Sequence, residues 1–148
     1  QTMIDVSGIK NPAQAAAMVA LPATLRAVTD GATEMVKHYL ACVYFTDTGE
    51  DEQPPVDALL SDSAQWEALR DCTAFIADCQ AQNLLAPYMA AVPNPWEQMG
   101  HDLWLTRNGH GAGFWDRGLG DLGDKLSDIA RHAGGVDVCQ GDDGLIYF

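Results

Sequence analysis

The chain has 148 residues, of which 47% are hydrophobic, so it can bury one compact core but is short for two ordinary domains. Its charge is strongly negative, because 21 Asp and Glu face 8 Lys and Arg, giving −13 at pH 7. Binding to nucleic-acid phosphates or to an anionic membrane surface depends on clustered basic side chains. The composition therefore argues against direct contact with DNA, RNA or such a membrane.

The acidic residues are concentrated in the middle of the sequence. Residues 41–100 hold ten acidic side chains and one basic side chain, whereas residues 1–40 hold three of each. Such a charge can serve solubility alone, without any partner. It can also imitate the charge of DNA and compete for a basic protein surface, and both interpretations stay open. The second predicts an acidic surface made by Glu50, Asp51, Glu52, Asp57 and Asp62.

The four cysteines have neither the spacing of a zinc site nor that of a CxxC pair. On one helix Cys72 and Cys79 would lie roughly 10 Å apart, which is too far for a disulfide. We therefore expect free thiols in a reducing cytosol. No segment resembles a signal peptide or a membrane-spanning helix, which also favours a cytoplasmic protein without a membrane partner.

The N-terminal residues 1–34 are predicted to form an arm with helical character. Pro12 suits the first position of a helix, because a proline there loses no hydrogen bond. Pro22 and the Asp30-Gly31 step are predicted to interrupt this helix. Beyond that interruption, apolar residues recur at helical spacing on one predicted buried face: Met35, Val36, Tyr39, Leu40 and Val43.

The middle of the chain predicts a loop followed by a long helix. Residues 46–57, TDTGEDEQPPVD, combine glycine, paired prolines and acids, which is typical of a loop. Residues 61–89 are predicted to be a helix capped by Ser61 or Ser63, and the proline-rich residues 90–100 a connector. The predicted buried stripe of that helix consists of Trp66, Leu69, Cys72, Phe75, Ile76 and Cys79.

The C-terminal third predicts an antiparallel sheet. Residues 101–106 and 111–116 are β-prone and flank an Asn-Gly step, which is a strong hairpin signal. Residues 119–133 are predicted to be a helix, and residues 136–140 and 145–148 a second hairpin around GDDG. The sequence therefore predicts an α+β fold, in which a helical N-terminal half precedes a β-β-α-β-β antiparallel unit.

The most specific motif of the chain is HDLWLTRNGHGAGFWDRG, followed by GDDGLIYF at the C-terminal end. These two segments resemble a family of small proteins encoded by tailed phages and prophages. The usual forms are HDFWLTRNGHGAGFWDRG and GDDGKIY, so Leu103 replaces Phe and Leu145 replaces Lys. The resemblance covers residues 35–148, which we predict to be a single α+β domain, with residues 1–34 as an extension. It implies a phage origin and the cytoplasm of a bacterial host, but no catalytic residues.

Three uses of the glycine-rich segment 106–117 stay open. It can be simply a well-formed hairpin. It can recognise a protein or a small anion, because arginines and exposed aromatic residues are enriched at binding hot spots. In that case the binding residues are Arg107, Asn108, His110, Trp115, Asp116 and Arg117.

A metal-dependent or acid–base site is the third use of this segment. Its potential ligands are His101, Asp102, His110, Asp116 and His132. However, the sequence has no HExxH motif, no nucleophile elbow and no phosphate-binding loop. We therefore predict no catalytic residues, no bound metal and no cofactor.

The sequence predicts a non-enzymatic phage accessory protein that acts by binding a host or phage protein. The favoured partner handles nucleic acid in host defence, and the acidic surface would act as a DNA mimic. The alternative is a small-ligand or metal site at residues 106–117, with hydrolytic activity as an option. A terminal LIYF strand at a sheet edge could also pair two copies into a homo-oligomer.

Overall fold

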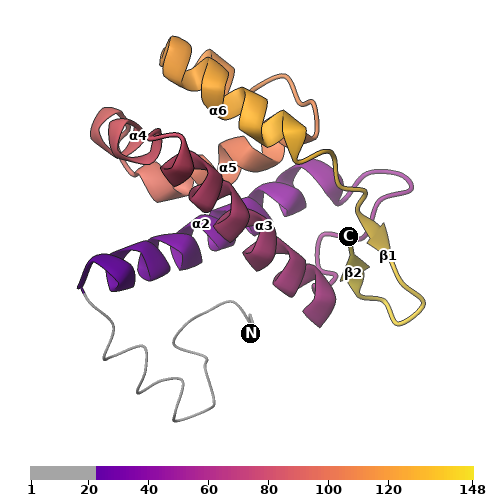
Figure 1. Cartoon of the computed structure of the whole chain (residues 1–148). Coiled ribbons are helices and arrows are strands. Elements are labelled where there is room, and N and C mark those ends of the chain that lie inside the picture. The colour runs from indigo at the N-terminus through magenta and orange to yellow at the C-terminus, as the bar shows by residue number, and fades with distance from the viewer. Residues whose placement is uncertain (1–22) are drawn as a thin grey trace.

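A computed structural model describes residues 23–148 (Figure 1). The predictions for Pro12 and Pro22 lie outside these described residues. The elements are α2 (Ala23–Asp47), α3 (Asp62–Ala81), α4 (Leu85–Ala91), α5 (Pro95–Arg107), the 3-10 turn η2 (Phe114–Asp116), α6 (Asp121–His132), β1 (Cys139–Gln140) and β2 (Ile146–Tyr147).

The described part of the chain is helical, with one two-stranded sheet at its C-terminal end, so the predicted α+β fold with a β-β-α-β-β unit is wrong. The second predicted hairpin is present but short: β1 and β2 pair antiparallel, with Cys139 opposite Tyr147. The other side of β2 is covered, because Ile146 exchanges backbone hydrogen bonds with Leu59 and Ser61. Ile146 therefore offers no free strand edge to a second copy of the chain, and the homo-oligomer stays a prediction.

The first predicted hairpin is replaced by helix α5. Met99, Leu103 and Trp104 are buried. Their helical spacing can be seen only in a stretch of sequence that starts at Pro95, because a stretch that starts at His101 leaves out Met99. Six residues starting at His101 are too few to distinguish a helix from a strand. The proline-rich start of α5 was predicted to be a connector, although proline suits the first turn of a helix.

The Asn108-Gly109 step ends a helix instead of turning a hairpin. Gly109 has a left-handed φ of 70° and its N–H donates to the Thr106 carbonyl at 3.2 Å. The next N–H, of His110, donates to the Leu105 carbonyl at 3.0 Å. These two bonds form a Schellman motif, which satisfies the last carbonyls of α5.

Helix α2 runs without interruption through Asp30 and Gly31, contrary to the prediction, and it also crosses the predicted boundary after residue 34. Gly31 leaves room for α5, because a Cβ there would lie 2.1 Å from Cε2 of Trp96. Further along, a Cβ on Gly100 would lie 2.2 Å from the Met35 carbonyl oxygen. The two helix backbones therefore touch, and small residues make the contact possible.

The core lies where α2, α3, α5 and α6 meet (Figure 1). All five residues of the predicted α2 stripe are buried, as are Cys72, Phe75, Ile76 and Cys79 of the predicted α3 stripe. The other two residues of that stripe differ, because Leu69 is only partly buried and Trp66 has 52% of its surface exposed. The predicted cap is confirmed for Ser61, whose Oγ accepts the Ala64 N–H at 3.1 Å. The predicted helix 61–89 breaks at Asn83, which has a left-handed φ of 58°.

The cysteines predict a simple pattern of thiol reactivity. Burial raises the pKa of Cys42 to about 11 and that of Cys79 to about 12, and it raises the pKa of Cys72 well above its usual value. Cys139 is exposed. Because the thiolate is the reactive form, one thiol per chain should react quickly with a disulfide reagent at neutral pH, and four after denaturation.

The check is a time-resolved thiol titration of the native chain and of its Cys139→Ser variant. We expect the variant to lose the fast phase completely. Fast reaction of a second thiol in the native chain would contradict the burial of Cys42, Cys72 and Cys79.

None of the helices in the described residues is both long enough and apolar enough to cross a lipid bilayer.

Candidate functional site

Arg107, predicted to bind a ligand, is used inside the fold. Its side chain is only 6% exposed, and Nη1 donates to Asp71 at 2.9 Å and to the Tyr39 hydroxyl at 3.1 Å. Its Nε and Nη2 donate to the carbonyls of Gly134 and Ala133 at 2.7 and 3.1 Å. One guanidinium thus joins α5 to α2 and α3 and to the C-terminal end of α6.

Asn108 and Asp116 also make contacts within the chain. The Asn108 amide donates to the Trp104 carbonyl at 2.9 Å, and its oxygen accepts the Val136 N–H at 2.8 Å. The Asp116 carboxylate accepts the Gly113 N–H at 3.0 Å and so fixes the start of η2. These contacts favour the structural interpretation of the segment 106–117.

Arg117 is engaged by a buried acid. Asp102 has 0% of its side chain exposed, and its Oδ1 accepts from Nη2 of Arg117 at 2.8 Å. Arg117 Nε lies 3.2 and 3.3 Å from the two oxygens, so the pairing is bidentate. Gln98 adds a hydrogen bond to the same carboxylate at 3.1 Å.

The remaining two residues of the predicted binding segment are more accessible. Trp115 is 45% exposed, and His110 is half-buried. Among the described residues, the predicted ligands His101, Asp102, His110, Asp116 and His132 do not form a group with metal-ligand spacing.

A small pocket of 290 Å³ lies beside Arg117. Tyr88 lines it, and its buried hydroxyl has no hydrogen-bond partner among the described residues. Burial is the main cause of the raised pKa of Tyr88. Of the predicted segment 106–117, Arg117 alone lines this pocket, so the pocket is not the site that the small-ligand alternative predicted.

The five predicted acidic-surface residues are exposed, as expected. Four of them lie on the loop between α2 and α3, and Asp62 begins α3. The loop has a fixed path, because the Tyr44 hydroxyl donates to the Ala58 carbonyl at 2.6 Å and the Gly49 N–H donates to the Pro54 carbonyl at 3.0 Å. The carboxylates are therefore presented by an ordered loop.

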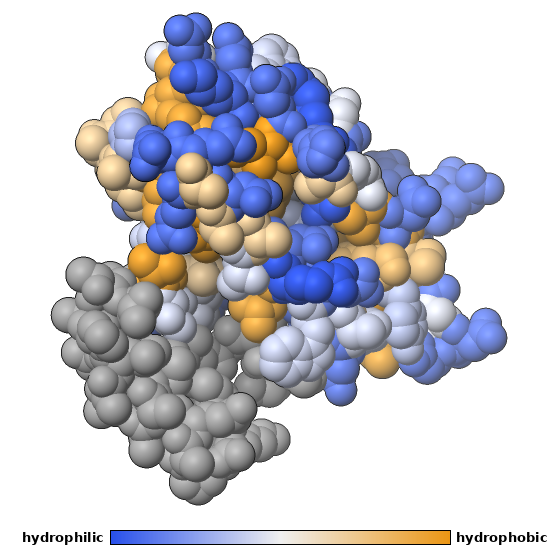
Figure 2. Space-filling view, viewed as in Figure 1, coloured by the Kyte–Doolittle hydropathy of each residue, from blue (hydrophilic) through white to orange (hydrophobic). Residues whose placement is uncertain are grey.

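Exposed apolar side chains, which were not predicted from the sequence, accompany these acids. Within the described residues five large apolar side chains are exposed, and four of them fall between residues 45 and 66. We call residues 45–66 the acidic–apolar segment. Across the face of the molecule drawn in Figure 2, hydrophobic and hydrophilic residues lie side by side. The four are Phe45 (86%), Leu59 (70%), Val56 (69%) and Trp66 (52%). Phe45 could have been found, because it is out of phase with the buried stripe of α2.

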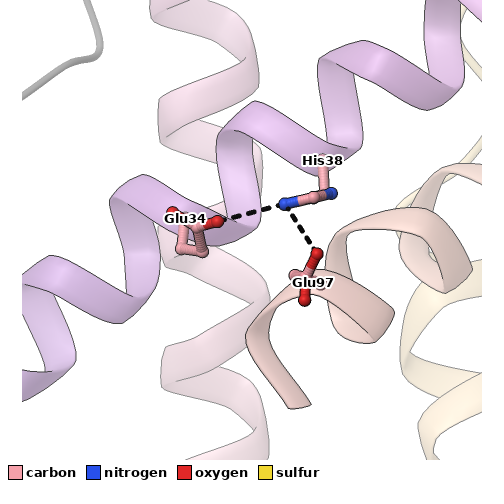
Figure 3. A group of neighbouring side chains, drawn as sticks. All are labelled: Glu34, His38 and Glu97. Carbon is pink, nitrogen blue, oxygen red and sulfur yellow. Dashed lines mark hydrogen bonds and ion pairs between the residues drawn. The ribbon is translucent and has the colours of Figure 1, made fainter. Parts of the chain in front are cut away.

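A second cluster joins α2 to α5 (Figure 3). Nε2 of His38 lies 3.1 Å from a carboxylate oxygen of Glu34 and 3.1 Å from one of Glu97. The His101 ring stands edge-on to the His38 ring, with centroids 5.3 Å apart. Burial, followed by the nearby His38, lowers the pKa of His101.

This Glu34–His38–Glu97 cluster was not predicted, although the sequence holds a signal for it. Glu34 and His38 are four residues apart, as are Glu97 and His101. Each spacing places two potential metal ligands on one helix face. The Glu97–His101 spacing was hidden because residues 90–100 were predicted to be a connector and residues 101–106 a strand. The Glu34–His38 spacing lay in a predicted helix but offers only two ligands.

Comparison with models of protein families, with curated proteins and with solved structures gives no match for this chain.

Proposed function

We propose that this chain is a phage-encoded accessory protein that binds a basic surface of a host protein through its acidic–apolar segment, residues 45–66. One observation carries the proposal. The five acids of the predicted surface and four of the five exposed large apolar residues in the described chain lie in the same 22-residue segment.

The two kinds of side chain contribute differently to binding. Apolar and aromatic groups supply most of the affinity of a protein interface when they are desolvated at its centre. Surrounding charges accelerate the encounter and select a partner of opposite charge. A surface that served solubility alone would gain nothing from exposing Phe45 and Leu59, so the combination favours a binding role.

A nucleic-acid-handling protein is the partner that this chemistry suits best. Such proteins carry basic surfaces that normally hold phosphates. A chain with a net charge of −13 is attracted to them over about 8–10 Å at physiological salt. The resemblance of residues 35–148 to a phage family supports a host defence protein as the target, in the cytoplasm of the bacterial host.

The proposal predicts that the purified chain displaces a discrete host protein from DNA. Extract of a bacterial host is loaded on DNA-cellulose, and bound proteins are eluted with the chain at low and at 150 mM salt, roughly the physiological ionic strength. We expect elution of a specific protein, with an apparent affinity at least tenfold weaker (about 1.4 kcal/mol) when the five acids are neutralised. The substitutions are Glu50→Gln, Asp51→Asn, Glu52→Gln, Asp57→Asn and Asp62→Asn.

A matched control separates a specific surface from general acidity. It neutralises five other exposed acids, and both variants have a net charge of −8, which is −13 plus 5. The control should elute the host protein as the native chain does. Equal behaviour of the two variants, or no eluted protein, would contradict the proposal. The control substitutions are Asp30→Asn, Asp78→Asn, Asp124→Asn, Asp128→Asn and Asp137→Asn.

A further inference from the structure

The Glu34–His38–Glu97 cluster brings two carboxylates to a single ring nitrogen. Both carboxylate oxygens lie 3.1 Å from Nε2 of His38. One nitrogen carries at most one proton, so it can donate one good hydrogen bond but not two. A cation placed between the three atoms would satisfy both carboxylates and the nitrogen lone pair together.

The separations fit a shared metal ion. Zinc binds histidine nitrogen and carboxylate oxygen at about 2.0–2.2 Å, so two ligands of one ion lie about 3–3.5 Å apart. The observed 3.1 Å between Nε2 and each oxygen falls in this range, and all three ligand atoms lie within 4.8 Å of one another. Little movement is therefore needed to close the site on an ion.

The two helices hold the ligands in place. Gly100 lets the α5 backbone touch α2 between Met35 and Tyr39, because a Cβ on it would lie 2.2 Å and 2.8 Å from backbone atoms of those two residues. His38 lies directly before Tyr39, and Glu97 lies one turn before Gly100. The ligands therefore sit at the rim of a close helix contact, on rigid elements that suit a preorganised site.

We propose that Glu34, His38 and Glu97 form a binding site for a divalent transition-metal cation of the zinc type, which links α2 to α5. Imidazole with two carboxylates is a donor set for Zn²⁺, whereas Mg²⁺ and Ca²⁺ take oxygen donors. The side chains of Glu34 and Glu97 are 46% and 42% exposed, so the ion has access from solvent and water completes its coordination. His101 acts as a positioning residue, because its ring packs against that of His38.

The test uses the full chain without a purification tag and Zn²⁺ alone, measured by titration calorimetry. We expect one ion per chain. The site variants His38→Gln and Glu97→Gln should each weaken binding at least about tenfold. The matched controls His132→Gln on α6 and Glu67→Gln on α3 should leave the affinity unchanged, since both side chains lie outside the cluster.

Two further measurements keep the result interpretable. Melting curves in a chelator show whether the site variants fold, and Glu34→Gln provides a variant at the most exposed ligand. In the histidine NMR spectrum, the diamagnetic Zn²⁺ ion should shift the ring signals of His38 and His101 but not those of His110 and His132. Zn²⁺ binding that ignores the site substitutions, that Mg²⁺ abolishes at equal concentration, or that does not occur in the native chain would overturn the proposal.

Discussion

Replacing Arg107 with alanine is expected to lower the free energy of unfolding by about 3–4 kcal/mol. The change removes a guanidinium that is 6% exposed and leaves the carboxylate of Asp71 and the buried hydroxyl of Tyr39 without this donor. It also uncaps the end of α6, whose carbonyls at Ala133 and Gly134 accept from the same side chain. For a domain of this size the melting temperature should fall by roughly 10 °C in a thermal unfolding experiment.

Arg70 provides the matched control for this prediction. It lies 3.5 Å from the same Asp71, but its side chain is 69% exposed. Exposed ion pairs contribute little, so Arg70→Ala should cost no more than about 1 kcal/mol. A loss as large as that of Arg107→Ala would show that the charge of Asp71, rather than the buried network, sets the cost.

Arg107→Lys separates charge from geometry. Lysine keeps the positive charge but cannot donate from a planar fork to Asp71, Ala133 and Gly134 together. We therefore expect it to recover less than half of the stability lost in Arg107→Ala. Full recovery would contradict a role for the fork.

The sequence could predict elements whose buried faces are long enough to show their period. The stripe from Met35 to Val43 and the cap at Ser61 were correct, because helix spacing and cap chemistry are local properties. Helix α5 was missed because Asn108-Gly109 suits two structures equally. A left-handed glycine can close a hairpin or a helix, and only the period of the preceding residues decides between them.

For the candidate sites, too, features set by the local sequence could be predicted and features set by tertiary contacts could not. The exposed acids from Glu50 to Asp62 could be predicted, since charged residues in a loop remain in water. The exposure of Trp66 could not, because it depends on which helix covers that part of α3. The Glu34–His38–Glu97 cluster could not be predicted, because it forms only where α2 contacts α5. That contact is a tertiary feature, which Gly31 and Gly100 make possible.

The close contact between α2 and α5 can be tested by adding a methyl group at Gly100. Gly100→Ala should destabilise the chain by about 2–3 kcal/mol, although alanine is favoured over glycine inside a helix by about 1 kcal/mol. Packing prevails because the new Cβ would meet backbone atoms of Met35 and Tyr39 at 2.2 and 2.8 Å, and a helix backbone cannot rotate away as a side chain can. The two helices must then move apart. Denaturant unfolding measures the change, and a gain in stability would contradict the contact.

Gly111→Ala is the control, because a Cβ at Gly111 meets nothing within 4 Å and its φ is not left-handed. It should leave stability unchanged or raise it by up to about 1 kcal/mol. The pair of variants also connects the fold to the proposed metal site. Moving α5 away from α2 separates Glu97 from His38, so Gly100→Ala should weaken Zn²⁺ binding while Gly111→Ala should not. Because neither glycine is a ligand, a loss confined to Gly100→Ala would show that the helix contact itself preorganises the site.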